Sequence, residues 1–191
     1  MKKIGVLALQ GDFEAHQKML AKLSVESVQI RTSGQLDSVD GLIIPGGEST
    51  TLIKLMRAFD LIEPIREFHK KGKPIFGTCA GSILAAKNIR NSEQFRFGLI
   101  DITVERNGYG RQVNSFECDV ATSLGPELMH AVFIRAPKII QTGSSVEILA
   151  AYEDAPIAAR ENQVLVATFH PELTDDIRLH QFFIEKMVGK L

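Results

Sequence analysis

A cysteine stands between two glycines in the segment GTCAG at residues 77–81. An apolar run precedes this segment and a helical pattern follows it, which is the strand, turn and helix order of a nucleophile elbow with sulfur replacing the hydroxyl. Gly77 and Gly81 are expected because larger side chains beside the sharp turn would collide. The helix N-terminus favours the reactive thiolate of Cys79, and the amide of Ala80 could serve as one oxyanion donor. A single cysteine is more often a buried structural residue, but the strand-to-helix position favours the nucleophile here.

A cysteine nucleophile needs a base, and the sequence contains five histidines. His170 directly follows a predicted strand and is held by the next residue, Pro171. Catalytic groups in an open α/β sheet gather at the carboxyl ends of strands, so we expect His170 and Cys79 at one edge of the sheet. The other four lie in predicted helices or a loop: His69 and His180, which we expect to be solvated on amphipathic helices, His16 in a helix near the end of the first strand, and His130 in a loop.

An acidic residue follows the candidate base after two positions. In an extended segment Glu172 would point the same way as His170. It could accept the second imidazole N–H, fix the tautomer and stabilise the imidazolium. Considered alone, Glu172 would be a loop carboxylate at the start of the last helix. Beside His170, the third member of a Cys-His-Glu triad is the favoured interpretation.

The segment PGGEST at residues 45–50 marks another strand end. Paired glycines before a helix let the backbone approach a ligand closely. The amide of Gly47 could therefore supply the second oxyanion donor. A phosphate-binding turn or a plain capping loop is the alternative, but no lysine follows in the Walker A manner, which disfavours nucleotide binding.

These segments need a scaffold of strands and helices, and the first half of the chain predicts one. Short apolar runs alternate with helical patterns there, which favours a mostly parallel sheet with helices on both faces. We predict strands at 4–9, 25–30, 41–44 and 74–78, and helices at 13–23, 50–59, 63–71 and 81–88.

The second half of the chain is strand-rich and ends in a helix predicted at 174–188. Little helical pattern separates its strands, so we expect antiparallel strands added to the parallel sheet, with Asn162 and Gln163 forming a tight turn. The strand-like segments are 99–104, 113–120, 131–134, 146–152, 157–160 and 163–169.

Composition limits the class of protein. The 191 residues are 45% apolar and 24% charged, with 22 basic and 23 acidic residues and a net charge of −1. These values are ordinary for a globular domain and give no indication of a nucleic acid or an anionic membrane as partner. We expect one domain over residues 1–191. Two cysteines are too few for a disulfide framework, and the apolar runs are too short for a signal peptide or a membrane span, so we expect a cytoplasmic protein. Cys118, in an alternating strand, is expected to be a structural thiol.

The three chemical segments together resemble the class I, triad-type glutamine amidotransferases. The elbow, the Pro-Gly-Gly loop and the His-Pro-Glu segment stand in that family's order. Within this class, strings along nearly the whole chain are similar to the glutaminase subunits of pyridoxal 5′-phosphate synthases. They are VLALQGD at 6–12, PGGEST at 45–50, GTCAG at 77–81, RNGYGRQ at 106–112, FIRAP at 133–137 and FHPELT at 169–174.

The resemblance implies a flavodoxin-like α/β fold and hydrolysis of L-glutamine to L-glutamate and ammonia. The ammonia would pass to a synthase subunit that builds pyridoxal 5′-phosphate from a pentose phosphate and a triose phosphate, in a hetero-oligomeric complex. Neither a metal nor a bound cofactor is implied. The resemblance also implies a glutamine-binding set, in which arginine could meet the substrate carboxylate and glutamate could meet the ammonium or hold an arginine. That set is Gly47, Glu48, Ser49, Arg106, Ile134 and Arg135.

Releasing free ammonia would be wasteful, so we expect weak glutaminase activity in the isolated chain and higher activity when the synthase is added. We expect the loop that contains Gly46 and Gly47 to be the switch, because a flipped peptide there would remove one oxyanion donor. Three alternatives remain. The acceptor could belong to histidine or nucleotide synthesis. The chain could be a cysteine peptidase or chaperone-like hydrolase, although those tend to place a histidine where Ala80 stands. A non-catalytic regulatory module would have no use for an intact Cys79, His170 and Glu172.

Overall fold

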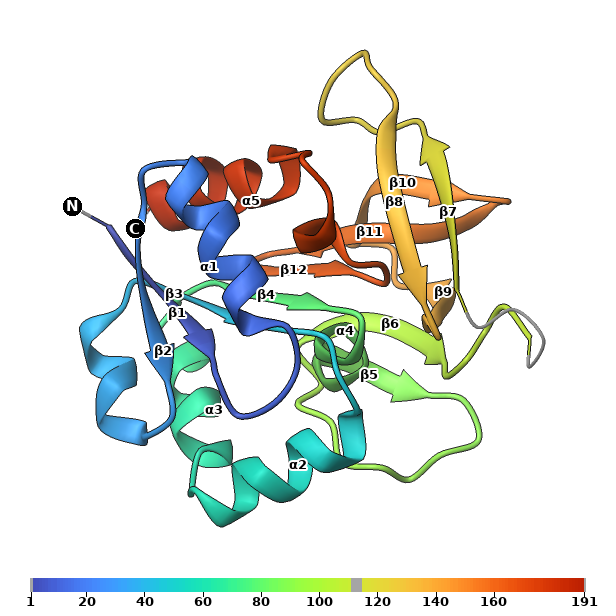
Figure 1. The fold of residues 1–191 in the computed structure, drawn as a ribbon. Helices are drawn as coiled ribbons and strands as arrows, with labels where there is room; N and C mark the ends of the chain where they lie inside the picture. The colour runs from blue at the N-terminus through green and yellow to red at the C-terminus, as the bar shows by residue number, and fades with distance from the viewer. Residues whose placement is uncertain (1, 111–114, 191) are drawn as a thin grey trace.

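The computed structural model describes residues 2–110 and 115–190 (Figure 1). Within these residues the strands form a seven-stranded sheet and two smaller sheets of three and two strands. The main sheet has the order β10-β11-β12-β4-β3-β1-β2. Its strands are β1 (Lys3–Leu7), β2 (Glu26–Ile30), β3 (Gly41–Ile44), β4 (Ile75–Thr78), β10 (Glu147–Tyr152), β11 (Ala155–Glu161) and β12 (Val164–Ala167).

Five neighbouring strands of this sheet, from β12 to β2, are parallel. β10 and β11 extend one edge in antiparallel fashion. Glu161 pairs with Val164, so Asn162 and Gln163 form the two-residue turn that was predicted, with Asn162 at φ 50°. The predicted mixed sheet, mostly parallel with added antiparallel strands, is confirmed.

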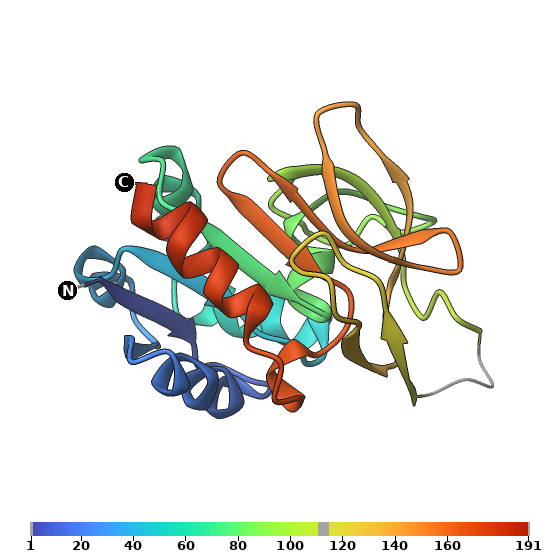
Figure 2. The same ribbon diagram turned by 90° about the horizontal axis from the view of Figure 1, so that it is seen from above.

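Helices cover both faces of the main sheet, as Figures 1 and 2 show. α1 (Phe13–Lys22) and α5 (Arg178–Phe182) lie on one face, and α2 (Ser49–Ala58) and α3 (Ile62–Lys70) lie on the other. The alternation of side chains along each strand produces this division. In β4, Phe76 packs into the cluster beneath α1 and α5, whereas Ile75 packs into the cluster beneath α2 and α3.

The smaller sheets extend from the same side of the molecule as β10 (Figure 1). One contains β5 (Ala86–Ile89), β6 (Ile100–Glu105) and β9 (Lys138–Thr142), and the other contains β7 (Ser115–Val120) and β8 (Met129–Ile134). The two termini lie at the opposite end of the main sheet (Figures 1 and 2). The smaller sheets therefore provide walls beside the carboxyl ends of the central strands.

Several predicted boundaries were wrong. The helix after the cysteine, α4 (Ala80–Ala85), stops before residue 88 because the chain turns into β5, which was not predicted, and β9 was missed as well. The last helix begins at Arg178 rather than at residue 174, and continues as a π-helical turn over Phe183–Met187 and a 3-10 turn over Val188–Lys190. Short 3-10 turns at Ser33–Ser38 and Pro171–Leu173 were also missed. Residues 113 and 114, within one predicted strand, lie outside the described residues.

Among residues 2–110 and 115–190, no helix is both long enough and apolar enough to cross a membrane.

Candidate active site

Four adjacent strands of the main sheet deliver the candidate catalytic segments to one edge. β12, β4, β3 and β1 are neighbours, and all are parallel. Their carboxyl ends lead to His170, Cys79, the Gly46–Gly47 pair and Gln10, respectively. Parallel pairing thus brings together residues that are up to 160 positions apart in the chain (170 − 10 = 160). This is the edge at which open α/β sheets bind ligands.

Cys79 occupies the sharp turn between β4 and α4. Its backbone lies in an unusual region, with φ 45° and ψ −105°, which is typical of a strained functional turn. A side chain at Gly77 would meet the carbonyl oxygen of Gly81 at 2.5 Å, and one at Gly81 would meet the carbonyl oxygen of Ile44 at 2.0 Å. Both glycines are therefore sterically required, as expected. Cys79 is 6% exposed, and its sulfur lies 3.9 Å from the carbonyl oxygen of Ile134.

His170 and Glu172 form a buried pair beside this turn. His170 Nδ1 lies 2.7 Å from Glu172 Oε1, and the two residues are 7% and 5% exposed. The predicted extended conformation is wrong, because Pro171–Leu173 forms a 3-10 turn closed by the amide of Leu173 donating to the His170 carbonyl. The contact forms nonetheless, since Oε1 of the longer glutamate side chain reaches Nδ1 from within the turn.

Electrostatics favours a charged imidazole at His170. Burial lowers its pKa, but the Cys79 sulfur and the Glu172 carboxylate outweigh burial and raise the pKa of His170 to about 10. Burial also disfavours the charged form of Glu172 and so raises the pKa of this carboxyl group. His16 and His170 outweigh burial and hold the pKa of Glu172 below its ordinary value. The buried arrangement therefore supports an imidazolium beside the sulfur, with an ionised glutamate behind it.

Two further histidines lie behind Glu172. His16 Nε2 is 3.4 Å from Glu172 Oε2 and 3.1 Å from Thr78 Oγ1, and His16 Nδ1 is 2.9 Å from His180 Nε2. His16 and His180 are both 0% exposed. The expectation that His180 would be solvated is therefore wrong, because its helix turns this residue toward Phe76 of β4.

The loop after β3 lies against the Cys79–His170 pair. A side chain at Gly46 would meet His170 Cε1 at 2.5 Å and Cys79 Cβ at 3.2 Å. Gly47 has φ 137°, a conformation that favours glycine, and Gln10 Oε1 accepts a hydrogen bond from the amide of Glu48 at 3.0 Å. The loop is thus fixed in a glycine-dependent conformation by the end of β1.

A cavity of about 260 Å³ opens over these groups. Every residue of the predicted catalytic, oxyanion and substrate-binding sets lines it, except the buried Glu172. The lining residues are Gln10, Gly47, Glu48, Ser49, Cys79, Ala80, Ile83, Arg106, Asn107, Ile134, Arg135 and His170. Arg111 and Gln112, from one of the family strings, lie outside the described residues.

Charged side chains meet on the open wall of the cavity. Arg106 Nη2 lies 3.4 Å from Glu48 Oε1, and the two side chains are 38% and 41% exposed. The other Glu48 oxygen accepts from the Thr51 amide at 2.7 Å and from the Thr50 hydroxyl at the start of α2. Burial raises the pKa of Glu48, but the hydrogen bonds from Thr50 and Thr51 together outweigh burial and lower this pKa to about 2. Glu48 therefore holds an arginine while it caps a helix.

Sequence reasoning missed one residue that organises this wall. Gln94 Oε1 accepts from Arg106 Nη1 at 3.0 Å and from Ser49 Oγ at 3.2 Å. Gln94 lies in a loop without a motif, so only its position in space shows this link. Gln10 and Asn107 could have been suspected, because both belong to strings that resemble the family.

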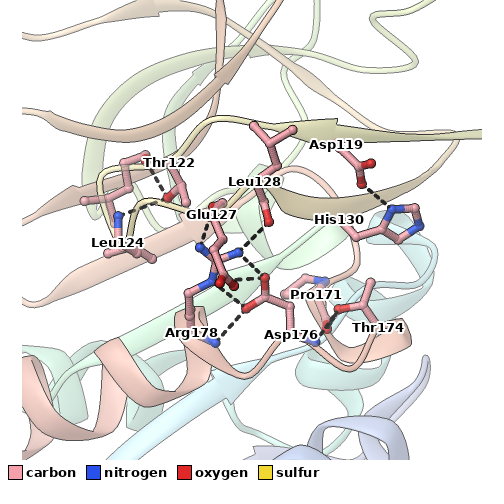
Figure 3. Close-up of polar contacts among 11 residues, drawn as sticks. Asp119, Thr122, Leu124, Glu127, Leu128, His130, Pro171, Thr174, Asp176 and Arg178 are labelled. Carbon is pink, nitrogen blue, oxygen red and sulfur yellow. Dashed lines mark hydrogen bonds and ion pairs between the residues drawn. The ribbon is translucent and has the colours of Figure 1, made fainter.

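A polar network ties the segment that contains Glu172 to the residues just before β8 (Figure 3). Arg178 donates to the carbonyls of Glu127 and Leu128 at 2.8 and 2.9 Å and pairs with Asp176 at 2.5 Å. The amide of Asp176 donates to Thr174 Oγ1 at 3.1 Å. A second tie runs from the His170 amide to the Val132 carbonyl at 2.8 Å. The segment that carries His170 and Glu172 and the strand that ends at Ile134 are therefore held as one unit.

The remaining candidates lie elsewhere. His130, expected in a loop, is in β8, where one ring nitrogen lies 2.8 Å from Asp119 (Figure 3). Its other ring nitrogen lies 3.1 Å from Glu117, and the two contacts raise the pKa of His130. Cys118 is a partly exposed free thiol on β7. In the part of the chain that the structure describes, no group of three or more His, Cys, Asp or Glu side chains is placed to hold a metal ion.

Comparison with known proteins shows the family to which the chain belongs. The profile described as "SNO glutamine amidotransferase family" matches residues 6–189. The chain therefore belongs to the SNO glutamine amidotransferase family, as the resemblance predicted.

Curated relatives match over almost their full length. The chain is 54% identical over 186 residues to "Pyridoxal 5'-phosphate synthase subunit PdxT" of Carboxydothermus hydrogenoformans, covering 97% of both chains. It is 53% identical to the protein of the same name from Thermotoga maritima, covering 96% of this chain and 98% of the relative.

Solved structures share the fold. One titled "Crystal structure of glutamine amidotransferase" has a TM-score of 0.91 and 46% identity, covering 97% of this chain and 98% of that one. The structure of PurLQS from Thermotoga maritima has a TM-score of 0.73 at 15% identity, covering 97% and 98%, which shows a shared fold only. The predicted fold class is thus confirmed.

Proposed function

We propose that this protein is the glutaminase of a pyridoxal 5′-phosphate synthase and hydrolyses L-glutamine through Cys79, His170 and Glu172. The observation that carries the proposal is one cavity with Cys79 and His170 in its wall and Glu172 Oε1 2.7 Å behind the imidazole. Membership of the glutamine amidotransferase family and the names of the relatives support the substrate and the pathway.

In the first half-reaction, the Cys79 thiolate attacks the carboxamide carbon of glutamine. The amides of Gly47 and Ala80 donate to the oxyanion that forms, a contribution worth about 2.7–4 kcal/mol per donor. The tetrahedral intermediate then collapses, its C–N bond breaks, and His170 gives its proton to the departing nitrogen. Ammonia leaves and a glutamyl thioester remains on Cys79.

In the second half-reaction, neutral His170 takes a proton from water. The resulting hydroxide attacks the thioester carbonyl at the same oxyanion donors. The C–S bond breaks, glutamate leaves, and Cys79 returns as a thiolate beside the imidazolium. Glu172 keeps Nδ1 protonated throughout, so that Nε2 is the atom that exchanges protons with the reacting groups.

Glutamine binding is assigned to the open wall of the cavity. The substrate carboxylate would pair with Arg106 or Arg135, since guanidinium groups bind carboxylates in a two-pronged manner. Glu48, which already holds Arg106 at 3.4 Å, would orient that arginine or meet the substrate ammonium. Ser49 and the backbone around Gly47 and Ile134 would complete the pocket.

A synthase subunit is the proposed ammonia acceptor and regulator. The wall that binds glutamine is half-exposed, and the loop that supplies the Gly47 amide depends on a glycine conformation at φ 137°. A docked partner could complete this wall and fix the orientation of the peptide that supplies the Gly47 amide. We further propose that residues 1–191 act as one glutamine amidotransferase domain and that the protein works in the cytoplasm, which fits its two free thiols.

The test is ammonia release from glutamine by wild type, Cys79→Ala and Cys118→Ala, each with and without a synthase subunit. We expect Cys79→Ala to lose activity, Cys118→Ala to keep it, and the synthase to raise the rate. Normal hydrolysis by Cys79→Ala would contradict the nucleophile. A fully active isolated chain would contradict the gating. If only a synthase of histidine or nucleotide formation raised the rate, the ammonia acceptor would belong to that pathway instead.

A further inference from the structure

The catalytic carboxylate has two oxygens, and the proposed triad uses only one. Glu172 Oε1 accepts from His170 Nδ1, whereas Oε2 is buried and has no hydrogen-bond partner among the described residues. The group that faces Oε2 is His16 Nε2, at an ion-pair distance of 3.4 Å. An anionic oxygen buried without a donor is costly, so the protonation of His16 at this atom matters.

We propose that His16 is a positioning residue that presents its Nε2–H to Glu172 Oε2, and that His180 fixes His16 in this tautomer. The proposal rests on the triad function of Glu172 proposed above. It extends the ordered chain from Cys79 through His170 and Glu172 to two histidines on α1 and α5.

The distances between the rings support one direction of donation. His16 Nδ1 and His180 Nε2 are 2.9 Å apart, so one of these nitrogens must carry the shared proton. If His180 Nε2 carries it, His16 Nδ1 is the acceptor and His16 Nε2 bears the proton that faces Glu172. The reverse direction would place a lone pair of His16 against the carboxylate. It would also leave a buried N–H at His180 Nδ1, which has no partner within the described residues.

Both rings act as neutral donors rather than as cations. Burial lowers the pKa of His16, although Glu172 and Asp12 oppose this and His170 adds to it. Burial, together with His16, lowers the pKa of His180 to about 3. The titratable groups that face His16 are thus Glu172 and His170 from the triad segment, Asp12 at the start of its helix, and His180 from α5.

The surrounding residues hold the two rings in place. Phe76 packs edge-on against both imidazoles, with ring centroids 6.3 Å from His16 and 5.5 Å from His180. Thr78 Oγ1, 3.1 Å from His16 Nε2, can share the same proton because a hydroxyl oxygen accepts. Thr78 directly precedes Cys79, so the pair also links the nucleophile turn to the carboxylate.

The direct test is the tautomer of each ring, read from imidazole ¹⁵N shifts in the full-length protein and assigned with His16→Gln and His180→Gln. We expect His16 to carry its proton on Nε2 and His180 to carry its proton on Nε2. An unprotonated Nε2 in His16 would overturn the proposal, whatever the activity of the enzyme.

Kinetics of glutamine hydrolysis, measured with the synthase subunit present, provide the second test. His16→Leu should lower kcat by about 10- to 100-fold with little change in KM, because the N–H that faces the charged carboxylate is lost. The acid limb of the pH profile should move to higher pH, because a buried carboxylate without a donor protonates more readily. In His16→Gln the amide N–H lies near the position of Nε2, so kcat and the acid limb of the pH profile should stay close to those of the wild type.

A matched pair at His180 covers the case in which His16→Leu fails to fold. Glutamine at 180 places its amide near Nε2 and should retain the rate, whereas asparagine places it near Nδ1 and should lower kcat. Equal rates in His180→Gln and His180→Asn, or a wild-type rate in His16→Leu, would overturn the positioning role. If Cys79→Ala also hydrolysed glutamine normally, the proposed function itself would fail, which separates the two outcomes.

Discussion

The two sides of His170 differ in how they are built. On one side lie Glu172, His16 and His180, all buried and joined through ring nitrogens and carboxylate oxygens over short distances. On the other side, Glu48 and Arg106 are about 40% exposed and project from loops beyond β3 and β6. The first group is enclosed between helices and the main sheet, whereas the second is open to solvent.

In the proposed function, this difference in burial separates the proton-transfer groups from the groups that bind substrate. A buried polar network is rigid when its members are paired, because breaking any pair leaves a costly unsatisfied group. Exposed ion pairs contribute little and rearrange easily. In the proposed function, the proton-transfer groups are therefore built into the isolated chain, while the proposed substrate wall could respond to glutamine or to a partner.

The largest effect on kcat should come from removing the negative charge on the buried side of His170. Glu172→Gln removes the charge that stabilises the imidazolium and allows the wrong tautomer of His170. We expect kcat for glutamine hydrolysis to fall by about 10³- to 10⁴-fold, as for the orienting acid of other triads. Asp175→Asn, an exposed change in the same segment, is the control and should leave kcat unchanged. A loss below tenfold in Glu172→Gln would mean that the carboxylate does not orient His170.

A steric change at the boundary between the two sides should have the next largest effect. Gly46→Ala places a methyl group 2.5 Å from His170 Cε1, so the ring or the loop must move. A displacement of about 1 Å can cost about 100-fold in kcat. Gly34→Ala, with open space around the added carbon, is the control. Steady-state kinetics of both variants, with thermal melting to verify folding, provide the measurement, and an unaffected Gly46→Ala enzyme would contradict the observed packing.

A change on the open side should affect binding more than chemistry. Arg106→Ala removes the guanidinium that Glu48 and Gln94 hold. We expect KM for glutamine to rise by about tenfold or more with a modest change in kcat, since uniform binding is lost. Arg90→Ala, which breaks an ion pair with Glu105 away from the cavity, should change neither constant. An equal fall in kcat and kcat/KM would instead place Arg106 among the groups that stabilise the transition state.

The smallest effect concerns stability against pH. The folded pKa of His170 is about 10, above its ordinary 6.5, so its protonation stabilises the fold fully below about pH 6.5. That contribution is lost as pH rises toward about 10. Thermal melting across this range should show a decline that is shallower in Cys79→Ala, because the sulfur helps raise the pKa. Parallel curves for the two proteins would argue against coupling between Cys79 and His170.

Much of the fold was predictable because its signals are local. β3 was predicted at its observed bounds, and the alternation of apolar runs and helical patterns gave the parallel sheet. β5 was missed because its four residues, two of them exposed, continue the helical pattern of α4. The start of α5 was misplaced because Thr174, Asp175 and Asp176 look like a helix start, whereas Asp176 binds Arg178 in the turn before the helix.

The buried side of the site shows the limit of sequence reasoning. His180 was expected to face water because its predicted helix is amphipathic. In the folded chain it contacts His16, 164 positions away, at 2.9 Å. No local pattern encodes such a contact, since it depends on how α1 and α5 pack on the same face of the sheet.

The sequence by itself determined the candidate nucleophile segment, its candidate base and acid, and the class of sheet that positions them. These follow from glycine sterics, strand ends and periodicity, which act over a few residues. Only the tertiary structure placed His16 and His180 behind Glu172, joined Gln94 to Arg106, and divided the site into an enclosed side and an open one. Burial and hydrogen-bond partners are properties of packed surfaces, and the packing of distant segments fixes them.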